Sequence, residues 1–174
     1  METRNIGKGL AALRIALGAG FLFAGLEKVL HFDGSTKAFD AAGFLKFATV
    51  GTTPGSAAKA IVNPTHDFWV SLAGNAGLMS VINTLVVFGE VAIGVALILG
   101  LATRFAGVAA ALMMALFWVA NWSFANGIVN EQFMYGIVAA FLAYAGAGET
   151  FGLDAIIERT PLVLSQPKLR YVLG

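Results

Sequence analysis

The chain has 174 residues, of which 58% are hydrophobic and only 12% are charged. A soluble domain of this length carries about a quarter of its residues as charged side chains, so the composition predicts a membrane protein. The net charge of +1 gives no electrostatic case for nucleic acid as a partner. The chain has no cysteine, which excludes disulfides, thiol catalysis and iron–sulfur clusters with cysteine ligands.

Four apolar segments have the length and composition expected of membrane helices, which need roughly 20 mostly apolar residues. They lie at about residues 10–30, 78–101, 105–124 and 132–147. The connections after the second and third segments are short. The sequence therefore predicts an all-α fold, a polytopic membrane four-helix bundle that forms one domain over residues 1–174.

The first and second segments are separated by a long link at residues 31–77. Links of this length usually contain structure of their own or serve a function. Aromatic residues alternate with charged ones at residues 37–48, and residues 63–73 begin with Asn-Pro and contain Phe68 and Trp69. Both patterns are typical of short helices in the membrane interface. A polar tail is expected at residues 154–174.

The distribution of lysine and arginine predicts the orientation in the membrane. One side of a four-span protein collects most of these residues, namely Arg4, Lys8, Arg104, Arg159, Lys168 and Arg170. The other side has Lys37, Lys46 and Lys59, which are spread over the long link. We therefore expect a multi-pass protein of the cell membrane with both termini and the tail in the cytoplasm and the link outside.

Four charged residues lie within the predicted spans, namely Arg14, the adjacent pair Glu27 and Lys28, and Glu90. Arg14 and Lys28 share one face of the first helix with two glycines, and Glu90 shares a face of the second helix with Gly94. A charge at the bilayer centre costs at least about 2.5–3.5 kcal/mol, so these faces are expected to meet. Glu90 lies fourteen residues before Arg104, roughly 21 Å along the helix, which brings its depth nearer to Lys28 than to Arg14.

Two interpretations of these charges stay open at the sequence level. Arg14, Lys28 and Glu90 can form a structural ion pair that locks the two helices together. Alternatively, Glu90, with Lys28 and Glu131 nearby, handles protons beside a lipid-soluble redox substrate. The protonation state of Glu90, paired with Lys28 or protonated alone, would distinguish them.

Aromatic and polar residues are expected to gather at the external end of the bundle. Ring stacking and hydrogen bonding to carbonyl oxygens are what a quinone headgroup requires. The candidate quinone-binding residues are Trp118, Trp122, Asn121, Tyr135, His31 and Trp69. An aromatic belt with polar helix caps is the simpler explanation of each residue alone. The sequence predicts no metal, haem or nucleotide site.

Three stretches, together with an Ala/Met-rich third helix, resemble the DoxX superfamily of small four-helix membrane proteins. They are RIALGAGFLFAGLEK at residues 14–28, GEVAIGVALILGLATR at residues 89–104 and AGAGETFGLD at residues 145–154. The long aromatic link is more similar to the DoxD branch, the membrane subunit of thiosulfate:quinone oxidoreductase. The resemblance implies electron transfer from thiosulfate to quinone, formation of tetrathionate and a second protein subunit. Arg14, Lys28, Glu90 and Arg104 match the polar pattern of the family.

These observations give two main hypotheses. In the first, the chain is a subunit of a quinone-linked redox system that oxidises thiosulfate or a similar small donor. In the second, it is a non-catalytic scaffold or assembly subunit of a larger membrane complex, and its intramembrane charges are structural. A small transporter that uses Glu90 has less support, because no internal repeat is evident. Whether the chain is an enzyme stays open at this level.

Overall fold

The computed structural model describes residues 2–32, 34, 36–47, 50–52, 59–61, 63–122 and 127–174. Its four longest helices are α1 (Glu2–Leu30), α4 (Ala76–Leu99), α5 (Thr103–Asn121) and α6 (Glu131–Tyr144). The link contains α2 (Ala41–Phe47), β1 (Val50–Thr52), β2 (Lys59–Ile61) and α3 (His66–Ala73). After α6 come α7 (Asp154–Ile157), α8 (Pro161–Ser165) and the 3-10 helix η1 (Pro167–Tyr171).

Within these described residues, α1, α4 and α5 are long and apolar enough to cross a membrane. Their outer faces present large apolar side chains: Phe88 is 71% exposed, Phe105 65% and Leu112 62%. Such faces are stable when lipid covers them. The expected all-α membrane fold is therefore confirmed. The last residues of the expected span 105–124 lie outside the described residues.

The fourth predicted span corresponds to α6, which is shorter than the other three. It has 14 residues, so it extends about 21 Å at helical rise, whereas a hydrocarbon core is about 30 Å thick. It ends at Tyr144, and a series of turns follows through residue 150. Gly146, with φ of +60°, lies in these turns. The count of four spanning helices therefore stays an expectation.

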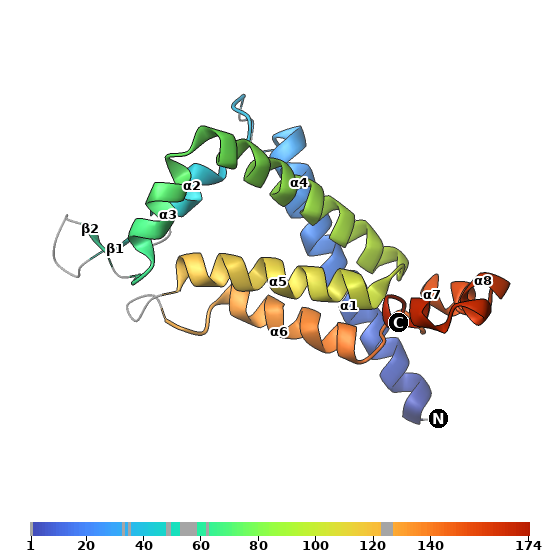
Figure 1. The fold of residues 1–174 in the computed structure, drawn as a ribbon. Helices are drawn as coiled ribbons and strands as arrows, with labels where there is room; N and C mark the ends of the chain where they lie inside the picture. The colour runs from blue at the N-terminus through green and yellow to red at the C-terminus, as the bar shows by residue number, and fades with distance from the viewer. Residues whose placement is uncertain are drawn as a thin grey trace.

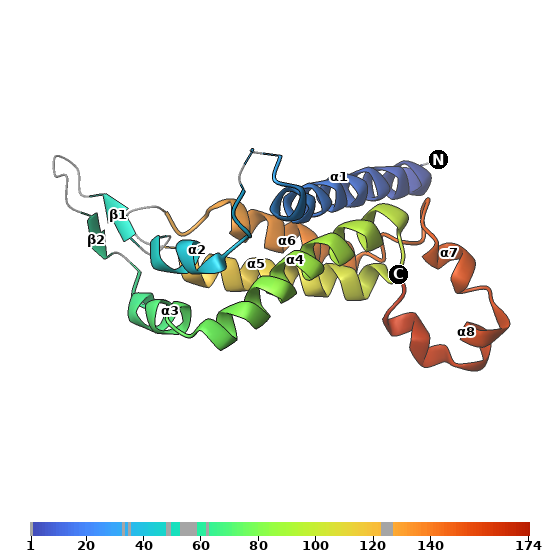
Figure 2. The same cartoon turned by 90° about the horizontal axis from the view of Figure 1, so that it is seen from above.

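The long helices are arranged as two pairs, with α1 packed along α4 and α5 packed along α6 (Figure 1). The pairs meet in a core that includes Phe21, Leu97, Ala110 and Leu142. Helices α4 and α5 join through a tight turn and diverge toward the link (Figure 1). Both chain termini lie at the end of the bundle where α4 meets α5 (Figure 2).

Local sequence explains where the long helices begin and end. The side chain of Asn75 accepts a hydrogen bond from Leu78 N and caps α4, and Asn130 caps α6 in the same way through Phe133 N. Gly100, with φ of +64°, ends α4 in the left-handed conformation that glycine adopts without strain.

The link contains the two short helices expected from its sequence, α2 and α3. It also contains a feature that the sequence interpretation missed, an antiparallel pair of three-residue strands. Val50 pairs with Ile61 and Thr52 with Lys59. Val, Ile and Thr favour strands, but three residues are too few for a clear alternating pattern.

Candidate functional site

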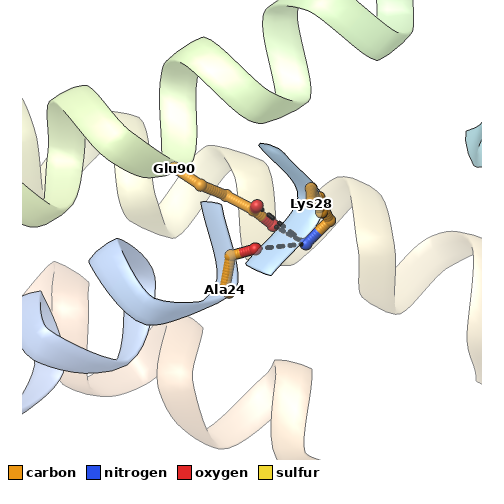
Figure 3. A network of polar contacts seen from close by, with 3 residues as sticks. All are labelled: Ala24, Lys28 and Glu90. Atoms are coloured by element: carbon orange, nitrogen blue, oxygen red, sulfur yellow. Dashed lines mark hydrogen bonds and ion pairs between the residues drawn. The ribbon is translucent and has the colours of Figure 1, made fainter. Parts of the chain in front are cut away.

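An ion pair joins α1 to α4 inside the bundle. Lys28 Nζ lies 2.8 Å from Glu90 Oε2 and donates a 3.0 Å hydrogen bond to Glu90 Oε1. The same ammonium donates to the carbonyl of Ala24 at 3.1 Å, one turn earlier on α1 (Figure 3). The Lys28 ammonium also lies 5.3 Å from the centre of the Phe39 ring in the link, a cation–π distance.

Glycines bring the two helix backbones close enough for this pair to form. A Cβ added at Gly25 of α1 would lie 2.9 Å from Val91 N and 3.1 Å from Glu90 Cβ. A Cβ added at Gly94 of α4 would lie 2.5 Å from Leu22 N. Small residues permit such approach between membrane helices. The flexible Lys28 side chain then covers the remaining offset in depth.

The pair is largely removed from solvent and lipid. The Glu90 side chain is 5% exposed and that of Lys28 22%. Two charges cost less to bury when each faces the other and has further hydrogen bonds. One ammonium therefore contacts both oxygens of the Glu90 carboxyl group.

A cavity of about 650 Å³ opens beside the ion pair. Polar side chains contribute to its wall, namely Lys28, Glu90, Glu131, Gln132 and Tyr135. The remaining wall is apolar and includes Leu13, Leu17, Phe21, Met114, Phe117 and Val138. Leu13 precedes Lys28 by fifteen residues on α1, so the cavity extends roughly 22 Å along that helix. It suits a ligand with one polar end and an apolar tail.

The structure brings together four of the residues singled out from the sequence. Lys28, Glu90, Glu131 and Tyr135 all line the cavity, although they come from three different helices. Glu131 begins α6, and the Asn130 cap fixes the start of that helix. Gln132 also lines the cavity, and sequence reasoning missed it. Its place beside Glu131 on α6 was the only signal.

The other five candidate quinone-binding residues do not line this cavity. Trp118 and Trp122 stack with ring centres 5.9 Å apart, and Trp118 Nε1 donates to the carbonyl of Ile128 at 2.7 Å. Trp69 Nε1 donates to Thr65 Oγ1 at 2.8 Å within α3 and its cap. His31 follows the last turn of α1 with φ of +51°.

Asn121, the fifth of these residues, is connected to the cavity indirectly. Its side chain donates to Gln132 Oε1 at 3.3 Å, and Gln132 Nε2 donates to Glu131 Oε1 at 3.1 Å. These three side chains form a polar chain from the end of α5 to the cavity. Asn121 can therefore orient Gln132 without contacting a ligand in the cavity itself.

Arg14 does not join the Lys28–Glu90 pair. Its guanidinium donates to the carbonyls of Ala147 at 2.7 Å, Thr150 at 3.4 Å and Phe151 at 3.0 Å, and the residue is fully buried. Fourteen residues separate Arg14 from Lys28, which is roughly 21 Å along α1 and beyond the reach of the Arg14 side chain. Arg14 holds the turns after α6 against the first helix instead.

Two further buried polar residues hold the ends of the bundle, and neither was a candidate from the sequence. Asp154 accepts hydrogen bonds from Ala102 N at 2.7 Å and Thr103 N at 2.8 Å, so it caps α5 from the far end of the chain. At the other end, Asn63 donates to the carbonyls of Val119, Ala120 and Trp122, the last turn of α5. The Asn-Pro pair at residues 63–64 indicated the start of the following helix, but it did not indicate that Asn63 caps the end of α5.

The apolar helices and their exposed apolar faces define an integral membrane protein, and an ion pair lies beside an elongated cavity within it. The family model described as DoxX matches residues 9–126, more than half of the chain, and the chain belongs to the DoxX family. No curated protein and no solved structure shows significant similarity to it.

Proposed function

We propose that the chain is a membrane subunit of a quinone-linked redox system and that quinone binds in the cavity between α1, α5 and α6. One observation carries the proposal: the buried Lys28–Glu90 pair opens onto a cavity of about 650 Å³ whose wall is otherwise mainly apolar. An isoprenoid quinone has the matching shape, a ring with two carbonyl oxygens and a long apolar tail.

The polar wall supplies groups of the kinds that a quinone ring needs. Lys28 Nζ, the Gln132 amide and the Tyr135 hydroxyl can donate hydrogen bonds to the carbonyl oxygens. The tail would follow Leu17 and Leu13 along α1 and leave the protein laterally into the bilayer.

Reduction of a quinone to a quinol takes up two electrons and two protons. Glu90 and Glu131 supply carboxyl groups in the wall that would transfer protons to the ring oxygens. The electrons would come from thiosulfate or a similar small anion, two thiosulfates giving one tetrathionate and two electrons. A second protein subunit would supply the route for these electrons, and Lys37 and Lys46 in the link would attract the anion.

We also propose that the protein resides in the cell membrane with both termini in the cytoplasm. The asymmetric distribution of lysine and arginine supports this orientation. The donor would then be oxidised outside, at the end of the bundle that bears the link.

Two matched substitutions on α1 test the binding site. A Cβ added at Gly20, which lines the cavity, or at Gly9, which does not, meets no atom within 4 Å. Gly20→Leu should fill the cavity and weaken binding of a ubiquinone analogue at least about tenfold, whereas Gly9→Leu should leave it unchanged. Equal binding by both variants, measured by quenching of tryptophan fluorescence in detergent, would remove the cavity as the quinone site.

Turnover tests the redox role. The protein, purified with its partner subunit, should pass electrons from thiosulfate to a quinone analogue, and Glu90→Gln should reduce the rate at least about a hundredfold without loss of the fold. If the wild type transfers no electrons from any small sulfur donor and binds no quinone, the proposal fails.

A second candidate function, a non-catalytic scaffold, is favoured by the way the charges join helices. Lys28 and Glu90 connect α1 to α4, and Arg14 connects α1 to the turns after α6. A scaffold role predicts that Glu90→Gln combined with Lys28→Met supports assembly of the complex as well as the wild type does. Co-purification of the partner subunit with each variant measures this.

A further inference from the structure

Residues 151–174, which contain α7, α8 and η1, follow the turns after α6, and we call them the C-terminal lobe. Backbone hydrogen bonds fix both of its ends to the α4–α5 turn. Leu153 N donates to Leu99 O at 3.0 Å and Asp154 N to Gly100 O at 2.9 Å. Phe105 N donates to Val172 O at 3.2 Å. Within the lobe, Gly174 N donates to the Asp154 side chain at 3.1 Å. The expected polar tail therefore folds against the turn between α4 and α5.

The C-terminal lobe is hydrogen-bonded to the joined ends of α4 and α5, two helices that are long and apolar enough to cross a membrane. It extends past the end of the bundle where the chain termini lie (Figures 1 and 2). Its surface carries large exposed apolar side chains, including Ile156 at 66%, Leu162 at 62%, Leu164 at 60% and Tyr171 at 80%. Apolar side chains at a membrane interface are stabilised by insertion between lipid headgroups and acyl chains.

A second cavity, of about 370 Å³, lies in this region. Two arginines and two glutamates line it together with Ala155 and Leu164; the charged residues are Arg159, Arg170, Glu149 and Glu158. Among the residues that the structure describes, none of these four side chains forms an ion pair with another. Opposite charges thus line one cavity without neutralising each other directly.

We propose that this cavity binds the headgroup of a phospholipid that carries both a phosphate and a primary amine, the chemistry of phosphatidylethanolamine. Arg159 and Arg170 would bind the phosphate, because guanidinium groups present paired donors that match its oxygens. Glu149 and Glu158 would accept hydrogen bonds from the ammonium group. Leu164 and the exposed apolar side chains nearby would contact the acyl chains.

The balance of charge selects this headgroup over the common alternatives. Two cations and two anions give the cavity wall no net charge, which suits a zwitterion better than an anionic lipid. A choline headgroup is also zwitterionic, but its quaternary nitrogen has no N–H to donate to a carboxylate. Phosphatidylglycerol has no cation to face the glutamates.

The test exposes the detergent-purified full chain to equal amounts of phosphatidylethanolamine, phosphatidylcholine and phosphatidylglycerol and measures the retained lipids by native mass spectrometry. The wild type should retain phosphatidylethanolamine about tenfold over the other two. Arg159→Gln with Arg170→Gln should lose that preference. Lys168→Gln, which removes a cation of the lobe that does not line the cavity, should keep it.

A second double variant tests the role of the glutamates. Glu149→Gln with Glu158→Gln leaves two arginines in the cavity, so its preference should shift to phosphatidylglycerol. Melting temperatures equal to that of the wild type show that the variants fold. Equal retention of the three lipids by the wild type, or an unchanged preference in either double variant, would overturn the proposal. Gly20→Leu should leave lipid retention unchanged, which separates this site from the quinone cavity.

Discussion

Asp40 shows how single residues fix the link to the bundle. Its Oδ1 accepts hydrogen bonds from Ala42 N at 3.0 Å and from the Asn83 side chain at 3.3 Å. Asn83 in turn accepts a hydrogen bond from Ala41 N at 2.8 Å. The Ala42 N–H, and to a smaller extent Asn83 and Lys46, lower the pKa of Asp40 below its usual value.

A lowered pKa in the folded state makes stability depend on pH in one direction. The contribution of Asp40 is fully present above the pKa that it has in the unfolded chain, and it is lost as the pH falls through the lower, folded-state pKa. Asp40→Asn should therefore flatten the acidic limb of a plot of melting temperature against pH. Asn83→Ala should raise the pKa of Asp40, measured by carboxyl NMR in micelles. An unchanged acidic limb in Asp40→Asn would contradict the assignment.

The Lys28–Glu90 pair permits a prediction about stability. Glu90→Gln leaves the Lys28 ammonium without its counter-charge in a mostly buried position, so we expect a loss of about 3 kcal/mol in the free energy of unfolding. Adding Lys28→Met removes that ammonium and should recover most of the loss. Denaturation in mixed micelles measures both changes. Additive losses in the double variant would show that the two side chains do not interact.

At the residue scale, the sequence predicted interactions that depend on helical spacing and depth. Lys28 and Glu90 were expected to meet because each shares a helix face with glycines, and they do. Asn63 and Asp154 could not be assigned as caps, because each caps a helix more than 50 positions away in the chain. Such a partner is set by how the link and the turns after α6 fold back, which no local pattern records.

At the scale of elements, the close packing of α1 against α4 can be tested by substituting a glycine at their contact. Gly94 lies against the backbone of Leu22, so Gly94→Ala must push the helices apart. We expect this substitution to reduce stability by about 1–3 kcal/mol. Gly20→Ala on α1 is the matched control, because open space surrounds that position, and it should leave the melting temperature unchanged or slightly higher.

Hydropathy predicted the long helices, but it did not predict where α6 ends or which segments pack against that end. The apolar segment at residues 132–147 suggested a longer helix than α6. Gly146 has a left-handed backbone conformation, with φ of +60°. Asp154, Thr103 and Gly174 pack closely around Gly148, so this stretch folds as turns. The contacts that stop the helix come from the C-terminal lobe and from α5, and they are invisible in the segment itself.

At the scale of the whole molecule, the orientation in the membrane is directly testable, because the chain has no cysteine of its own. Lys168→Cys places a thiol at the end with the chain termini, and Lys46→Cys places one in the link. A membrane-impermeant maleimide added to intact cells should label Lys46→Cys and reach Lys168→Cys only after the membrane is opened. Labelling of both from outside would contradict the proposed orientation.

The cavity is a property of the whole arrangement, which explains why the sequence could not predict its extent. Hydropathy indicated four helices but not that they form two pairs, α1 with α4 and α5 with α6. The cavity lies where α1 faces the second pair, and its residues come from all four helices. The sequence placed Glu131 and Tyr135 at the correct end of the bundle, whereas the separation of the tryptophans from the cavity depends on side-chain packing.

Part of the link lies over the cavity, so a ligand of the cavity is expected to enter from the bilayer. Phe39 contacts Lys28 and Phe44 contacts Phe117, and both Lys28 and Phe117 belong to the cavity wall. The link therefore covers the part of the cavity wall that Lys28 and Phe117 form. The proposed quinone would reach the rest of the cavity from the bilayer, so it is diluted in lipid and not in the buffer. Its dissociation constant is then expressed as a mole fraction of ligand in the membrane lipid. Adding empty vesicles at constant total ligand lowers this mole fraction and should empty the site.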